Sequence, residues 1–145
     1  MFFIKEFLIN DYDENFNKLL KQLTESNFNK TIFLNAYKNL SAQKKIFVVK
    51  NNDNDTIATG SILLEQKFTH NFSKVAHIED IVVLKSYRGR GIGKLLINFL
   101  VKFAEKNNCY KVILNCDEKN INFYKKLGFS KKNGEMSYYF FKKKI

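Results

Sequence analysis

The sequence predicts a single α/β domain, spanning residues 1–145, in which helices flank a mixed central β-sheet. Three observations predict this class. The apolar periodicity changes along the chain in the order β-α-α-β-β-β-α-β-α-β. A strand, a glycine-rich turn and a long amphipathic helix run unbroken through residues 75–106. No repeat, linker or change in composition divides the 145 residues, a length that suits one domain.

The N-terminal part contains a short strand and two helices. Residues 4–8 are expected to form the strand. Asp13 then precedes an amphipathic run with apolar side chains at helical spacing, and the pattern predicts a helix that Asp13 begins. The apolar positions of this helix are Phe16, Leu19, Leu20 and Leu23. Residues 29–40 show a weaker helical pattern.

Three strands follow before the glycine-rich turn. Residues 46–50 and 56–64 have strand-like composition, and the polar residues 51–55 between them predict a hairpin turn. Residues 75–84 form the next predicted strand. The polar segment 67–74, which joins it to the previous strand, is expected to be exposed.

The helix after the glycines has the clearest pattern in the chain. Its apolar residues predict one stripe that faces a core: Ile92, Leu95, Leu96, Phe99, Leu100 and Phe103. Residues 111–115 then predict a short buried strand. Asp117 is expected to cap a helix over residues 118–127, which Gly128 ends. Residues 136–141 predict the last strand.

Composition limits the class of protein. The chain has 25 Lys and Arg against 14 Asp and Glu, a net charge of +11 that attracts anions: nucleic acid, acidic membranes or phosphorylated small molecules. No apolar run reaches the ~18–20 residues of a membrane span, and no secretory signal is apparent, so a cytoplasmic location is expected. Cys109 and Cys116 are expected to be reduced. No metal site is apparent in the sequence.

The glycine-rich turn reads Arg88-Gly89-Arg90-Gly91-Ile92-Gly93-Lys94. Backbone N–H groups at the start of a helix, together with its dipole, attract anions, and glycine lets the backbone approach a phosphate closely. The spacing matches neither the P-loop nor the Rossmann fingerprint. Its chemistry is that of a pyrophosphate cradle. The alternative is a flexible turn that merely begins a helix.

Two motifs in this setting resemble those of the GNAT acetyltransferases. Arg88-x-x-Gly91-x-Gly93 resembles the family's Arg/Gln-x-x-Gly-x-Gly/Ala motif, and Asn120, Phe123 and Tyr124 before Leu127-Gly128-Phe129 resemble its second signature. The resemblance implies the GNAT fold and acetyl-CoA as cosubstrate. It implies the following cofactor-binding residues: Ile81, Val82, Val83, Arg88, Gly89, Arg90, Gly91, Ile92, Gly93, Lys94, Asn120, Phe123 and Tyr124.

Within that family, residues 58–129 are most similar to the glucosamine 6-phosphate N-acetyltransferases. The similarity lies in four segments: His77-Ile78-Glu79-Asp80-Ile81-Val82-Val83, Gly93-Lys94-Leu95-Leu96, Cys109-Tyr110-Lys111 and Asn120-x-x-Phe123-Tyr124. It implies a homodimer that acetylates the amino group of D-glucosamine 6-phosphate, an amino-sugar phosphate, on the route to UDP-N-acetylglucosamine. The implied substrate-binding residues are Thr24, Lys67, His70, Glu79, Asp80, Ile81, Tyr110, Lys111 and Asn115. The implied catalytic residues are Tyr124, Glu79 and Asp80.

The residues themselves support some of these roles. Glu79 and Asp80 interrupt an apolar strand, and because neighbours in a strand point to opposite faces, at least one carboxylate is expected to point inward. Tyr124 is expected to protonate the departing CoA thiolate, with Asn120 one helical turn earlier on the same face. The alternatives are an edge strand for the two acids, a core tyrosine, and solvated surface charges for the lysines Lys67 and Lys111.

Two positions depart from the family pattern, and rival functions remain. Asn115 stands where the family has an acid thought to help take the proton, and asparagine cannot be a base. Tyr139 stands where the family has an arginine that contacts the phosphate. The first rival is a GNAT enzyme with another acceptor, such as a protein lysine, a polyamine or an amino acid. The second is a basic nucleic-acid-binding module, which the periodic, core-like placement of most Phe residues disfavours.

Overall fold

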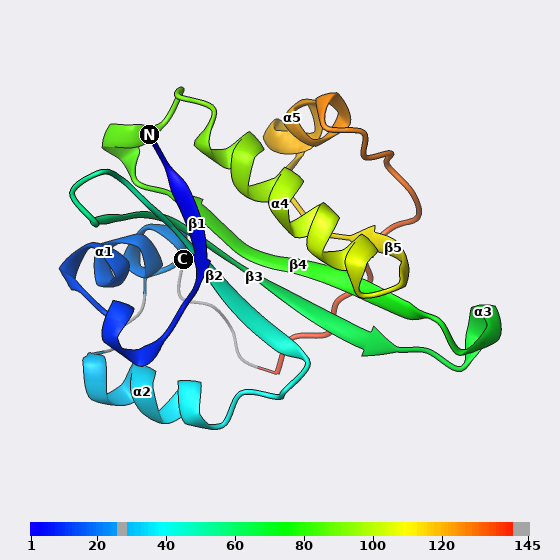
Figure 1. Ribbon diagram of the computed structural model, residues 1–145. Coiled ribbons are helices and arrows are strands. Elements are labelled where there is room, and N and C mark those ends of the chain that lie inside the picture. The colour runs from blue at the N-terminus through cyan, green and yellow to red at the C-terminus, as the bar shows by residue number, and fades with distance from the viewer. Residues whose placement is uncertain (26–28, 141–145) are drawn as a thin grey trace. The chain divides into compact units, whose positions relative to one another are not determined.

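The computed structural model describes residues 1–25 and 29–140 (Figure 1). Its strands are β1 (Phe3–Glu6), β2 (Lys44–Lys50), β3 (Thr56–Gln66), β4 (Lys74–Val83) and β5 (Cys109–Ile113). Its α-helical segments are α1 (Glu14–Leu23), α2 (Lys30–Lys38), α3 (Thr69–Phe72), α4 (Ile92–Lys106) and α5 (Ile121–Lys126). Short 3-10 turns lie at Ile9–Asp11, Lys85–Tyr87 and Glu118–Asn120.

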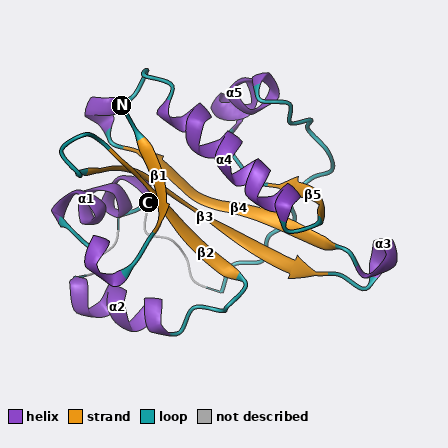
Figure 2. Cartoon of the chain, in the orientation of Figure 1, coloured by secondary structure: helices purple, strands orange, loops and turns teal. Residues whose placement is uncertain are grey.

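The described residues form a five-stranded sheet with the order β1-β2-β3-β4-β5 (Figure 2). The first three pairings are antiparallel, and β4 pairs with β5 in parallel. The parallel pair is joined through α4, as a crossover connection requires. These pairings confirm the mixed sheet that the sequence predicts.

Helices α1 and α2 cover one face of the sheet. Each begins at a side-chain cap: Asp13, as predicted, accepts a hydrogen bond from the Phe16 N–H at 2.7 Å, and Asn29 accepts one from the Ile32 N–H at 3.0 Å. An aromatic cluster fills the space between these helices and the strands. Phe7 lies at its centre and contacts the rings of Phe16, Phe33 and Tyr37.

Helix α4 covers the other face of the sheet. Its fully buried side chains are Ile92, Leu96, Ile97, Leu100 and Ala104. The predicted stripe is therefore wrong at Leu95, which is 40% exposed, while Ile97 is buried in its place. Phe99 and Phe103 pack against Phe47 of β2. None of the helices in the described ranges combines the length and the apolar character that a membrane span requires.

A buried charge network ties the 3-10 turn at Ile9–Asp11 to strands β1, β2 and β3. Lys50 is only 3% exposed, and its Nζ lies 2.8 Å from Thr56 Oγ1 and 3.7 Å from the Asp11 carboxylate. Asp11 also binds Lys5 Nζ at 2.6 Å. Burying a lone charge would be costly, so the network supplies every ion in it with a counter-charge.

The chain divides into two compact units, Met1–Leu114 and Asn115–Ile145. In the second unit, α5 ends in a Schellman motif: the Phe129 N–H bonds the Tyr124 carbonyl and the Gly128 N–H bonds the Lys125 carbonyl. This confirms the predicted end of the helix at Gly128. Its predicted start is wrong, because Asp117 makes no capping bond and a 3-10 turn precedes Ile121.

Two predicted strands differ from the structure. The strand expected over residues 111–115 is β5 at Cys109–Ile113, and it is not buried: Tyr110 and Ile113 are each 38% exposed, because β5 lies at the edge of the sheet. Residues 136–140 of the predicted last strand are exposed and form no strand, since they pair with no other strand of the described chain. Phe141, the end of that prediction, lies outside the described residues.

Candidate active site

The glycine-rich turn lies where β4 leaves the sheet and α4 begins. Gly89 and Gly91 both have a φ of +77°, a left-handed conformation in which a side chain is strained. A Cβ at either glycine would meet no atom within 4 Å, so the space above the turn is open. The backbone at the start of this 15-residue helix is therefore accessible to an anion.

Two arginines of the turn are held by neighbouring groups. The Arg90 guanidinium lies over the Tyr87 ring, 4.9 Å from its centroid. Arg88 donates from Nε to the Val83 carbonyl at 3.2 Å. Both arginines and Lys94 are exposed, so the glycine backbone is surrounded by positive charge.

A β-bulge interrupts β4 just before this turn. Thr59 pairs with Val82 and Ser61 pairs with Glu79, so Asp80 and Ile81 together face the single residue Gly60. Asp80 has a φ of +54°, which aspartate tolerates better than most residues. Gly60 permits the bulge, because a Cβ there would lie 2.3 Å from Ile81 Cδ1.

Strand β4 continues beyond its pairing with β5. The parallel register runs from Lys74 opposite Cys109 to His77 opposite Ile113, whereas β4 extends to Val83. A strand edge without a neighbouring strand presents N–H and C=O groups to any extended chain that carries amides. The predicted cofactor segment, Ile81–Val83, lies on this part of β4.

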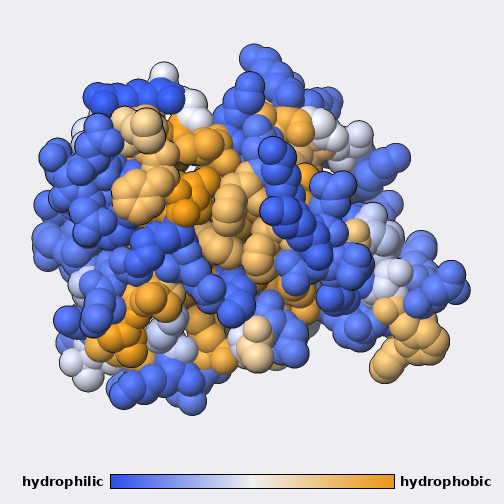
Figure 3. Space-filling view, in the orientation of Figure 1, coloured by the Kyte–Doolittle hydropathy of each residue, from blue (hydrophilic) through white to orange (hydrophobic). Residues whose placement is uncertain are grey.

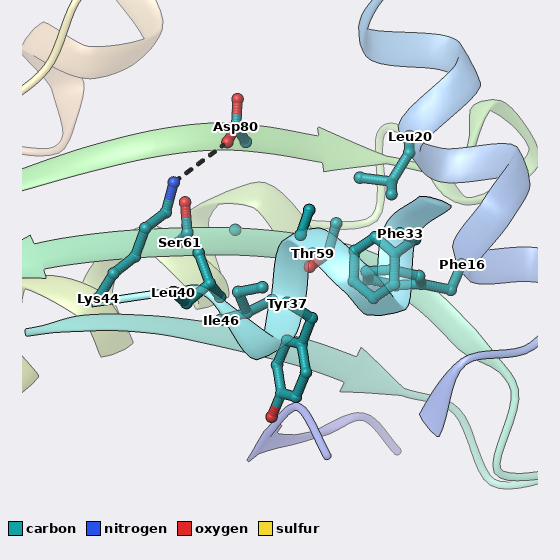
Figure 4. A pocket seen from close by; sticks show the side chains of 12 residues that line it. Phe16, Leu20, Phe33, Tyr37, Leu40, Lys44, Ile46, Thr59, Ser61 and Asp80 are labelled. Carbon is teal, nitrogen blue, oxygen red and sulfur yellow. Dashed lines mark ion pairs between the residues drawn. The ribbon is translucent and has the colours of Figure 1, made fainter. Parts of the chain in front are cut away.

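The bulge places Asp80 at the mouth of a pocket between the sheet, α1 and α2 (Figure 4). The pocket has a volume of about 170 Å³. Its walls are mostly apolar, and its polar groups are Lys44, Thr59, Ser61 and Asp80. Lys44 Nζ lies 4.0 Å from Asp80 Oδ2, the ion pair that Figure 4 marks.

The prediction that Glu79 or Asp80 points into the protein is wrong, because both residues are exposed. The prediction assumed regular alternation along the strand. The bulge breaks that alternation and turns the Asp80 carboxylate toward the pocket mouth instead of the core.

Three predicted substrate-binding residues lie together at the other end of β4. The His70 ring stacks on the Tyr110 ring at 4.3 Å, and Lys111 Nζ lies 5.5 Å from the centre of the same ring. His70, Asn71 and Phe72 all have positive φ, so α3 is an irregular turn. Non-glycine residues in this region often mark functional segments. We call His70, Tyr110 and Lys111 the distal cluster.

Lys67 lies beside the distal cluster and is paired with an acid. Its Nζ lies 2.8 Å from Glu65 Oε1, and His77 Nε2 lies 2.5 Å from the other oxygen of Glu65. The hydrogen bond to Glu65 raises the pKa of Lys67, with a smaller contribution from the charge of Glu65. Lys67 is therefore a cation that already has one carboxylate partner.

In the second unit, Tyr124 is the half-buried side chain of α5. Its ring packs edge-on against Phe123 at 5.0 Å and Phe129 at 5.8 Å. Burial raises the pKa of its phenol, and the charge of Cys116 raises it further. Asn120 and Asn115 are exposed in the same unit. Tyr124 therefore stays protonated at neutral pH and can act as an acid.

Comparison with known sequences identifies the family. The family model described as the acetyltransferase (GNAT) family matches residues 5–129. The chain belongs to this family. The glycine turn, the bulged β4 and Tyr124 all lie within the matched range.

Relatives with established names are similar over most of their length. Glucosamine 6-phosphate N-acetyltransferase 1 of Dictyostelium discoideum is 39% identical over 135 residues, 90% of this chain and 86% of the relative. The enzyme of that name from Candida albicans is 39% identical over 132 residues, 88% of this chain and 89% of the relative. The crystal structure of glucosamine-6-phosphate N-acetyltransferase from Arabidopsis thaliana superimposes with a TM-score of 0.89 at 36% identity, covering 97% of this chain and 99% of that one.

The distal cluster and Asp80 lie at different positions along β4. Lys111 is opposite Val75, and Asp80 follows five residues later on β4. At ~3.3 Å per residue this corresponds to roughly 16 Å along the strand. The structure thus brings His70, Tyr110 and Lys111 together, and it keeps them away from the carboxylate of Asp80.

Sequence reasoning missed two residues of this region. Lys44 resembles the chain's many other lysines, and only the three-dimensional fold places it beside Asp80. Gln22 of α1 hydrogen-bonds the backbone at the end of β4, 61 residues away in sequence. Nothing in the local sequence marks either residue. Thr24, one of the predicted substrate contacts, is exposed just after α1. It lines an open pocket with Lys85 and Ser86.

Proposed function

We propose that this protein transfers the acetyl group of acetyl-CoA to the amino group of D-glucosamine 6-phosphate by direct transfer within a ternary complex. The observation that carries the proposal is similarity over 86% and 89% of the length of two relatives that are named for this acceptor. The products would be N-acetyl-D-glucosamine 6-phosphate and CoA, on the route to UDP-N-acetylglucosamine.

The cofactor half of the site would be built from backbone. When bound, acetyl-CoA supplies an activated thioester and a leaving thiolate. The open turn at Gly89 and Gly91 would receive its pyrophosphate, with Arg88, Arg90 and Lys94 supplying charge. The edge of β4 at Ile81–Val83 would pair with the amides of the pantetheine arm, as a strand pairs with an added strand.

The acceptor would approach from the pocket mouth at Asp80. Its ammonium group would bind the carboxylate, and its proton would leave through water to Asp80 or Glu79. A backbone N–H near Ile81 or Val82 would stabilise the developing oxyanion. Asn115 cannot take a proton, so the neighbouring acids Glu79 and Asp80 would have that role.

Tyr124 would complete the reaction as the acid. The amine nitrogen forms its bond to the acetyl carbon, the carbon–sulfur bond breaks, and the sulfur takes the phenolic proton. The raised pKa of Tyr124 supports this role, because the phenol is protonated at the pH where the acceptor amine is free to react.

The acceptor phosphate would be bound by the distal cluster of a second subunit. The separation of roughly 16 Å along β4 favours a partner subunit as the source of the phosphate contact. In a homodimer with twofold symmetry, Lys111 of one subunit can lie beside Asp80 of the other. Exposed aromatic side chains near the cluster support such an interface: Phe68 is 87% and Phe72 is 67% exposed. Figure 3 shows hydrophobic surface at the projecting tip where α3 lies in Figure 1.

A CoA-release assay with a panel of amines tests the proposed acceptor. Glucosamine 6-phosphate should be turned over with a kcat/KM at least tenfold above glucosamine, spermidine, a lysine peptide and free amino acids. Glucosamine tests the phosphate contact, because it lacks only that group. If glucosamine 6-phosphate is inert while another amine is acetylated, the proposed acceptor is wrong and the GNAT assignment stands.

A further inference from the structure

The carbonyl of Val83 is the point at which α1 and the cofactor turn meet. Gln22 Nε2 donates to this oxygen at 3.2 Å, and Arg88 Nε donates to it at the same distance. A carbonyl oxygen has two lone pairs, so both of its acceptor sites are used. The Val83 carbonyl therefore accepts hydrogen bonds from two protein groups. The cofactor would hydrogen-bond to other backbone groups of this strand edge.

Gln22 also binds the backbone on the other side of Leu84. Its Oε1 accepts a hydrogen bond from the Lys85 N–H at 3.3 Å. Between these two contacts the last sheet bond, from the Leu84 N–H to the Ile57 carbonyl, ends the β3–β4 ladder. One half-buried amide thus holds the backbone on both sides of the residue at which the chain leaves the sheet.

We infer that Gln22 is a positioning residue for acetyl-CoA binding. The segment it holds leads directly into the turn Arg88–Lys94, whose backbone would receive the pyrophosphate. The Lys85–Tyr87 turn also has two local backbone hydrogen bonds, from the Tyr87 N–H to Leu84 and from the Arg88 N–H to Lys85. Asn51 Nδ2 donates to the Tyr87 hydroxyl at 3.0 Å, so Gln22 is the contact of the turn's backbone with α1. Gln22 therefore fixes the direction in which the turn starts, relative to the rigid α1.

The structure indicates why a side chain of α1 has this effect. Helix α1 is anchored at its start by the Asp13 cap and by buried Phe16 and Leu19. A glutamine on its last turn is therefore a fixed donor and acceptor. Helix α1 ends at Leu23, directly before Thr24. Gln22 therefore contacts the segment that leads to the cofactor turn and lies two residues before a predicted acceptor contact.

The inference rests on the proposed cofactor, and a Gln22→Met variant tests it. Methionine has nearly the same shape and removes both hydrogen bonds. We expect the Kd for acetyl-CoA, measured by calorimetry without acceptor, to rise by about five- to tenfold. The KM for acetyl-CoA should rise in parallel, while the KM for glucosamine 6-phosphate stays within twofold. Gln43→Met is the matched control, because among the described residues the Gln43 side chain hydrogen-bonds only the nearby Ser41, at 2.6 Å.

The outcomes separate the two levels of the proposal. If the wild-type protein binds no acetyl-CoA, the proposed function itself fails. If the wild type binds acetyl-CoA and Gln22→Met binds it equally well, the positioning role is overturned. A lower melting temperature with proportional loss of all kinetic constants, and no separate change in acetyl-CoA affinity, would also overturn it.

Discussion

The two ends of β4 use different chemistry. At the C-terminal end, from Asp80 to the glycine turn, the features that could bind a ligand are backbone groups: a bulge, an open strand edge and the start of α4. At the N-terminal end, the distal cluster consists of side chains from α3 and β5. The proposed cofactor features at the C-terminal end are backbone features of one chain, whereas the distal cluster lies roughly 16 Å farther back along β4. In the proposed function, the acceptor half of the site therefore takes its phosphate contact from a second subunit.

An Asp80→Asn substitution should have the largest effect and should be confined to the acceptor. Asparagine keeps the shape and tolerates the left-handed conformation, so the bulge remains. Loss of the carboxylate should lower kcat/KM for glucosamine 6-phosphate by about 10²–10⁴-fold. Calorimetry should give an unchanged Kd for acetyl-CoA. A variant with full activity would remove Asp80 from the acceptor site.

Replacement of Tyr124 by Phe should lower kcat by about 10²-fold, because the departing thiolate loses its acid. The affinity for acetyl-CoA should change little, since the ring and its contacts with Phe123 and Phe129 are kept. Steady-state kinetics with both substrates provide the measurement. Unchanged turnover would show that the Tyr124 phenol does not protonate the departing thiolate.

The cofactor end can be disrupted separately with Gly91→Val. A β-branched residue at a φ of +77° is strained by ~1–2 kcal/mol, and its side chain would occupy the open space above the turn. We expect the KM for acetyl-CoA to rise by about tenfold or more, with the acceptor KM little changed. Gly134→Val, at an exposed position with free space and no positive φ, is the control. An unaffected KM would argue against a phosphate site at this turn.

The backbone turn at residues 88–94 could be predicted from the sequence almost completely, and the arrangement around Asp80 only in part. Glycines in a strand–turn–helix setting are a local signal, and the turn formed as predicted. The bulge depends on a contact between Gly60 and Ile81 from different strands, so regular alternation gave the wrong orientation for Glu79 and Asp80. Lys44 and Gln22 act through neighbours distant in sequence, and no local pattern marks them.

The smallest expected effect concerns a region outside β4, the buried network around Asp11. Burial alone would raise the pKa of Asp11. The hydrogen bonds from Lys5 and the Leu8 N–H, with the charges of Lys5 and Lys50, outweigh burial and lower it. A lowered pKa contributes stability that is present above the ordinary value of 3.8 and is lost as the pH falls through the folded value.

Asp11→Asn should therefore cost about 1–2 kcal/mol of unfolding free energy at pH 7. The difference from wild type should narrow as the pH falls below 4, where the wild-type carboxylate becomes protonated. Urea unfolding at pH 7 and at pH 3 measures both values. A constant difference across this range would show that the charge of Asp11 contributes nothing.

Mixing two impaired variants tests most directly whether the two ends of β4 act in different subunits. Asp80→Asn and Lys111→Glu each damage one end, and each alone should be poorly active at low glucosamine 6-phosphate. If one site combines Asp80 of one subunit with Lys111 of the other, a refolded or co-expressed mixture contains hybrid dimers with one intact site. Random mixing should then restore about a quarter of the wild-type activity. A mixture no more active than the average of the two variants would contradict the account. It would show that Asp80 and Lys111 of the same subunit serve one site.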